Sequence, residues 1–99
     1  MTPEGKVKAK VKKVLDVYEV YYFCPATGGY GRSGIPDFVC CYKGKFIAIE
    51  CKAGKGKTTA LQDRELDRIQ KSGGVAIVVV DDSLSQLIEL ITIMSRKKP

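Results

Sequence analysis

Two carboxylates and an amine form the group of residues best suited to chemistry in this sequence. Asp37 begins one predicted strand, and Glu50 and Lys52 lie two residues apart on the next, so their side chains share a face. Carboxylate oxygens suit a hard divalent cation, and the backbone carbonyl of Cys51 is a further candidate ligand. Beside such an ion, Lys52 is placed to orient or deprotonate a water, or to stabilise charge on a phosphate. An exposed ion pair between Glu50 and Lys52 is the simpler alternative.

A set of short helices and strands must position these side chains. The apolar periodicity and turn signals predict, in order, a helix that opens at Thr2-Pro3, strands over Tyr21–Phe23, Asp37–Tyr42 and Lys45–Lys52, a helix from Thr58 or Thr59 to Lys71, a strand over Val75–Val80, and a last helix capped by Ser83 with Gln86. A tight turn is expected at Lys43-Gly44. The continuous apolar run from Val75 is typical of a fully buried central strand.

Two polar side chains stand on helix faces that are otherwise apolar. At about 100° per residue, Glu4 falls in the same arc as Val7 and Val11. Gln62 shares a face with Leu66 in the same way. A favourable interaction of Glu4 with the helix dipole, and an amide hydrogen bond of Gln62 within the core, are the alternatives to a role in a site.

The composition fits one domain over residues 1–99 and favours a polyanionic partner. The formal charge is +6 and the pI is about 9.2. Such a surplus on so small a chain points to nucleic acid first, although a merely basic protein fits the charge equally well. No apolar run approaches the length needed to cross a bilayer, and no signal peptide is recognised. We therefore expect a cytoplasmic protein without a membrane partner.

Three other kinds of site are excluded or disfavoured. The chain has no histidine, which excludes catalysis by an imidazole base. Its cysteines include no C-x-x-C pair, so neither a zinc site nor a disulfide framework is expected, and we interpret them as reduced and mostly buried. The Gly54–Thr58 segment is similar to a phosphate-binding P-loop, but Cys51 stands where that pattern requires its first glycine.

The motifs around the acids resemble those of one nuclease superfamily. Gly34-Ile35-Pro36-Asp37, followed on the next strand by Glu50-Cys51-Lys52, is similar to the PD-(D/E)XK signature. With Glu4 on the first helix and Gln62 on the helix after the E-x-K strand, the order resembles the VRR-NUC branch in its stand-alone form from phages and bacteria. Each motif is weak alone, but four in register with the expected elements are a strong signal.

The resemblance implies a fold and a catalytic centre. The fold is restriction-endonuclease-like α/β, an αβββαβ core with a central mixed sheet flanked by helices, plus a C-terminal helix. The resemblance also implies that Glu4, Asp37 and Glu50 bind Mg²⁺ or Mn²⁺. It implies that Lys52 assists the water that hydrolyses a DNA phosphodiester, and that Gln62 supports the catalytic groups.

The resemblance further implies how DNA is bound. Arg32 and Ser33 are expected beside the scissile phosphate, and Lys55 and Lys57 are candidate phosphate contacts, with a solvated basic loop as the alternative for the lysines. For a stand-alone member of the branch, the resemblance implies a homodimer that acts on branched DNA such as Holliday junctions or flaps. A non-catalytic DNA-binding module on a nuclease fold is the alternative function.

Overall fold

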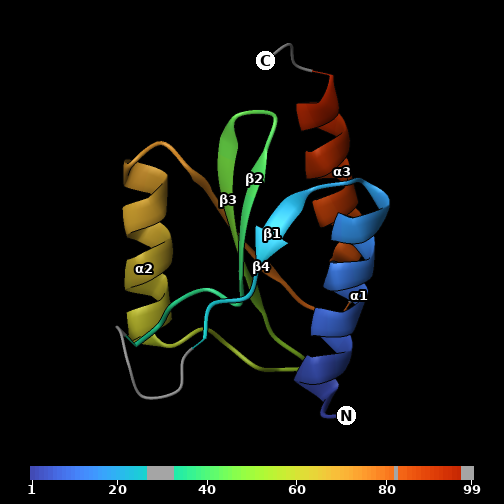
Figure 1. The fold of residues 1–99 in the computed structure, drawn as a ribbon. Coiled ribbons are helices and arrows are strands. Elements are labelled where there is room, and N and C mark those ends of the chain that lie inside the picture. The colour runs from blue at the N-terminus through green and yellow to red at the C-terminus, as the bar shows by residue number, and fades with distance from the viewer. Residues whose placement is uncertain (27–32, 82, 97–99) are drawn as a thin grey trace.

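The computed structural model describes residues 1–26, 33–81 and 83–96. Its helices and strands follow the predicted αβββαβα order (Figure 1). Their bounds are α1 Pro3–Val17, β1 Tyr21–Phe23, β2 Phe38–Tyr42, β3 Lys45–Cys51, α2 Ala60–Lys71, β4 Val75–Val79 and α3 Leu84–Ser95. Neighbouring strands run antiparallel from β1 to β3 and parallel between β3 and β4, which confirms the mixed sheet.

Helices cover both faces of this sheet. Figure 1 shows α1 and α3 side by side on one face and α2 on the other. Helix α1 begins as predicted: the side chain of Thr2 accepts a hydrogen bond from the backbone N–H of Gly5 at 3.0 Å, and Pro3 occupies the first turn. Its apolar stripe packs into the core, and the buried members are Val7, Val11 and Leu15.

The β2–β3 hairpin sets the register of the site. Lys43 and Gly44 form the two-residue turn, with φ of 51° and 79°. Both values are positive, as a type I′ turn requires, and this turn matches the twist of the paired strands. The register that follows pairs Phe38 with Ile49, so the residues just before and just after this pair, Asp37 and Glu50, are neighbours on the opposite face.

Strand β4 is not the central strand that its apolar run predicts. Within the described part of the chain it pairs only with β3, which leaves it at the edge of the sheet. Only Val79 is buried among its residues, and Val78 is exposed. The run is apolar because both faces of β4 are packed against helices, α2 on one side and α3 on the other.

The predicted capping box at the start of α3 is also wrong. Ser83 is the N-cap residue, but its side chain makes no capping hydrogen bond with the helix. Its Oγ instead accepts from the N–H of Val80 at 2.7 Å and donates to the Val80 carbonyl. The hydroxyl therefore closes the turn after β4. The buried stripe of α3 is Leu87, Ile91 and Met94.

The four cysteines, all within the described residues, are free thiols. Cys40 and Cys41 point to opposite faces of β2, one buried and one exposed. Cys51 is buried and Cys24 exposed, so half of the cysteines are buried rather than most of them. Burial raises the pKa of both Cys40 and Cys51 to about 12, which keeps these thiols protonated. In the same part of the chain, no helix has both the length and the apolarity of a membrane span.

Candidate active site

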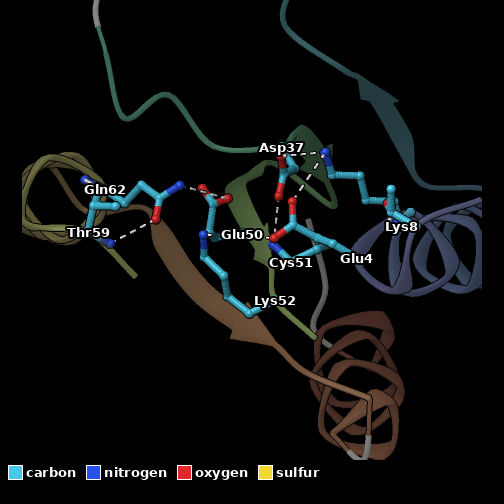
Figure 2. A network of polar contacts seen from close by, with 10 residues as sticks. Glu4, Lys8, Asp37, Glu50, Cys51, Lys52, Thr59 and Gln62 are labelled. Atoms are coloured by element: carbon cyan, nitrogen blue, oxygen red, sulfur yellow. Dashed lines mark hydrogen bonds and ion pairs between the residues drawn. The ribbon is translucent and has the colours of Figure 1, made fainter. Parts of the chain in front are cut away.

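The hairpin brings Asp37 and Glu50 together on the sheet face that α2 covers. Figure 2 shows their carboxylates side by side, with Glu4 approaching from α1 and Gln62 from α2. Glu50 is buried, with 2% of its surface exposed. Burial is the main cause that raises its pKa to about 8, and the neighbouring carboxylate of Asp37 adds to it. The positive charge of Lys52 acts in the opposite direction.

The two oxygens of Glu50 differ in their surroundings. Its Oε1 accepts a hydrogen bond from the side-chain amide of Gln62 at 3.3 Å. Its Oε2 is buried and has no hydrogen-bond partner among the described residues. An unpartnered buried carboxylate oxygen is costly in a folded protein unless another group satisfies it. This oxygen, next to a second carboxylate, is therefore the strongest indication of a bound cation.

Gln62 is positioned by the capping box of α2. Its side-chain carbonyl accepts from the N–H of Thr59 at 2.9 Å, and the Thr59 hydroxyl accepts from the N–H of Gln62 at 3.2 Å. This reciprocal pair fixes the amide group so that its NH₂ is directed at Glu50 (Figure 2). The amide that looked out of place on an apolar face is thus used twice, once to start the helix and once to hold the carboxylate.

Both oxygens of Asp37 are occupied. Its Oδ2 accepts from the backbone N–H of Cys51 at 2.8 Å, and its Oδ1 lies 3.2 Å from the ammonium group of Lys8. Burial lowers the pKa of Lys8, but the hydrogen bond and charge of Asp37 outweigh it, with Glu4 adding to them, so the pKa is raised. Sequence reasoning missed Lys8, although its position four residues after Glu4 is a recognisable pairing signal.

Glu4 and Lys52 meet at the edge of this cluster. The Lys52 ammonium lies 3.9 Å from Oε1 of Glu4, and Lys8 lies 3.7 Å from Oε2. The side chain of Lys52 is 12% exposed, whereas Glu4 is half-exposed. Glu4 is therefore paired with two lysines, one of which, Lys8, also contacts Asp37. The exposed ion pair of Glu50 and Lys52 that was the simpler alternative is not formed within the described residues, and both side chains are largely buried.

The donor set fits a divalent cation at the carboxylate pair. Across residues 1–26, 33–81 and 83–96, no three Asp, Glu, Cys or His side chains gather as a metal-binding set. The pair of Asp37 and Glu50 remains, and the protonated thiol of Cys51 leaves only the backbone carbonyl of that residue as a ligand. Two carboxylates and a carbonyl are hard oxygen donors of the kind that Mg²⁺ and Mn²⁺ prefer, with water completing the shell.

Gly34 allows the loop before Asp37 to pack against the start of α2. Its φ is +84°, and a Cβ at this position would lie 2.5 Å from the backbone carbonyl oxygen of Leu61. No side chain fits that gap. The contact brings the segment that carries Asp37 against the turn of α2 that carries Gln62, so the glycine of the G-x-P-D motif joins the two halves of the site.

Replacing Gly34 with alanine is expected to destabilise the protein by about 2 kcal/mol or more, because backbone strain and a backbone clash add. Gly44→Ala is the matched control, since Gly44 also has positive φ (+79°) but nothing within 4 Å of its Cβ position. Urea denaturation of both variants separates strain from clash. Equal losses in the two variants would mean that the Leu61 contact contributes nothing.

Three of the four residues predicted to contact DNA are described, and they lie in loops next to the elements that carry this cluster. Ser33 is exposed at the turn before Asp37. Lys55 and Lys57 are exposed in the segment between β3 and α2. Arg32 lies outside the described residues. The structure thus brings Glu4, Asp37, Glu50, Lys52 and Gln62 into one cluster and leaves the loop lysines outside it.

Comparison with solved structures places this geometry in a known fold. No protein-family model matches the chain. A structure described as a VRR_NUC domain superposes with a TM-score of 0.69, and the match covers 96% of each chain at 24% identity. The chain has the VRR-NUC fold. The predicted resemblance and the restriction-endonuclease-like fold class are thereby confirmed.

Two further similarities accompany the VRR-NUC fold. The catalytic domain of the homing endonuclease I-Bth0305I matches with a TM-score of 0.52, at 22% identity over 97% of this chain and 92% of that one. The protein "Putative nuclease p44" of Acyrthosiphon pisum secondary endosymbiont phage 1 is 41% identical over 59 residues. That alignment covers 59% of this chain and 63% of the phage protein, so the chain spans under two thirds of this relative.

Proposed function

We propose that this protein is a metal-dependent DNA endonuclease that hydrolyses phosphodiester bonds and prefers branched DNA such as Holliday junctions or flaps. The observation that carries the proposal is the buried Glu50 oxygen without a partner, set beside Asp37 and in the electrostatic field of Lys52, a shielded lysine that pairs with Glu4. The VRR-NUC fold and the similarity to a phage protein named as a nuclease support it. The preference for branched DNA rests on the resemblance alone.

In this mechanism Asp37, Glu50 and the carbonyl of Cys51 would hold Mg²⁺ or Mn²⁺, with Glu4 as a further acidic ligand. The bound cation would polarise the phosphate and lower the pKa of an attacking water. Lys52, shielded from solvent, holds its positive charge beside that water and the phosphate.

The surrounding residues keep these groups in place. Gln62 fixes one oxygen of Glu50, and the N–H of Cys51 fixes one oxygen of Asp37. Both contacts limit the rotation of a carboxylate, as supporting hydrogen bonds do at metal sites. Ser33, Lys55, Lys57 and Arg32 would contact the DNA backbone.

We further propose that residues 1–99 act as one domain in the cytoplasm of a bacterial or phage-infected cell and pair as a homodimer. The two-fold symmetry of such a dimer would match that of a four-way junction, so each copy could cut one strand. The formal charge of +6 supports DNA as the partner.

A cleavage panel tests the function. Labelled four-way junction, flap and linear duplex are incubated with Mg²⁺, Mn²⁺ or chelator. We expect cutting only with a divalent cation, fastest on the branched substrates, and none by Asp37→Asn. Binding without cutting on every substrate would instead favour the non-catalytic DNA-binding module.

A further inference from the structure

The sheet face that carries Glu50 continues as an open surface beyond α2. Opposed residues in an antiparallel pair point to the same face. Tyr21 pairs with Cys41, and Cys41 pairs with Phe46, which lies on the same side of β3 as Glu50. Phe23, two residues after Tyr21, shares this orientation. Three aromatic side chains on β1 and β3 therefore face the same way as the candidate active site.

These aromatic side chains are not used by the core. Tyr21, Phe23 and Phe46 are 69%, 50% and 45% exposed. On the opposite face, which α1 and α3 cover, Phe38 is buried and makes an edge-to-face contact with Tyr22 at 5.8 Å between ring centroids. The same strands thus bury their aromatic residues on one face and present them to solvent on the other, where α2 packs mainly on β4.

A hollow adjoins this surface at Phe46. Its volume is about 390 Å³, and it is lined by Phe46, Glu65, Arg68, Ile69, Ser72 and Gly74. Arg68 is mostly exposed and contacts Glu65 at 3.4 Å. Gly74 lets Ile69 and Phe46 pack closely against the backbone at the wall of the hollow, because a Cβ there would lie 2.8 Å from a methyl carbon of Ile69 and 3.2 Å from the Phe46 ring. Phe46 therefore has one side on the open surface and the other against a hollow with a guanidinium at its rim.

We propose that this surface, formed by Tyr21, Phe23, Phe46 and Arg68, stacks the unpaired bases of a single strand that continues from the cleaved phosphate. The proposal rests on the proposed nuclease function and names its substrate class: DNA in which single-stranded bases adjoin the cut. Exposed rings on a sheet face are the platform on which bases stack, and an exposed guanidinium complements the backbone phosphates. The formal charge of +6 suits the same polyanion.

The test compares DNA binding with and without a single-stranded tail. Fluorescence anisotropy in chelator measures the affinity for a blunt duplex and for duplexes carrying a 3′ or a 5′ tail. We expect tighter binding of a tailed duplex. Phe23→Leu and Phe46→Leu should each weaken tail binding about fivefold or more while the blunt-duplex affinity stays unchanged. Leucine keeps the surface apolar and removes the ring, so folding is conserved; Tyr18→Leu, at the end of α1, is the matched control.

A second measurement does not depend on variants. A fluorescent adenine analogue, 2-aminopurine, placed in the tail should be quenched on binding if the base stacks on a ring. No quenching, or unchanged tail affinity in both leucine variants, would overturn the proposal. So would a change of oligomeric state in those variants by light scattering, because the surface would then be a subunit interface. If tail binding depends on the rings but no substrate of the panel is cleaved, the stacking surface would be supported and the proposed nuclease function would be contradicted.

Discussion

Replacing Lys52 with alanine is expected to slow metal-dependent cleavage about a hundredfold or more, which is the usual contribution of a positioned proton-transfer or electrostatic group. DNA binding should change little, because the side chain is 12% exposed and faces Glu4 rather than the outer surface. Single-turnover rates at saturating protein, with Mn²⁺ and a labelled junction, measure the cleavage step. Anisotropy in chelator measures binding.

Lys55→Ala provides the matched control, since it removes an equal charge from an exposed loop next to the same strand. We expect this variant to bind more weakly and to cut at the normal rate once saturated. The two variants would then distinguish a contribution to the cleavage step from a contribution to DNA binding. Undiminished cutting by Lys52→Ala would remove this residue from the mechanism, and a large loss of stability would reassign it to folding.

The second prediction concerns pH and Glu50. Its pKa is about 8 in the folded chain against an ordinary value of 4.5, mainly because of burial. Between these values the folded protein retains a proton that the unfolded chain has released. The metal-free protein should therefore be most stable below pH 4.5 with respect to this group and lose stability as the pH rises toward 8. The slope is at most about 1.4 kcal/mol per pH unit.

Urea denaturation in chelator, repeated at pH values across that window, measures the slope. Glu50→Gln should flatten it, because the amide does not titrate and keeps nearly the same shape. Cys40 and Cys51, with ordinary values of 9.0 raised to about 12, and Lys8, raised from 10.5, titrate outside the window. A divalent cation should restore stability at the upper end. An equal slope in Glu50→Gln would mean that another group is responsible.

The elements that sequence reasoning placed correctly are those with local signals. Thr2 and Pro3 start α1, and Lys43 with Gly44 turns β2 into β3, because capping and turn formation depend on a few adjacent residues. The position of β4 in the sheet depends instead on which strands pair, and an apolar run does not encode that. Ser83 was correctly predicted as the N-cap residue of α3, but the predicted capping hydrogen bond was wrong, because the hydroxyl bonds with Val80 instead.

The same distinction between local and long-range features applies to the candidate site. The proximity of Asp37 and Glu50 followed from strand periodicity and a short turn, which act over a few residues. The burial of Glu50 and its raised pKa required α2 to pack over it, and the ion pair of Lys8 with Asp37 required α1 to lie beside the sheet. Neither could be predicted from spacing, because both depend on how distant segments come together.

The Lys8 bridge means that this chain supplies its own counter-ion. Asp37 and Glu4 share one ammonium group, that of Lys8, so a divalent cation that binds to these carboxylates would displace it. The released lysine would remain on α1, next to the same acids. Binding of the cation would thereby turn a lysine that is paired with two carboxylates into a free positive charge beside the site, where an incoming anion would meet it.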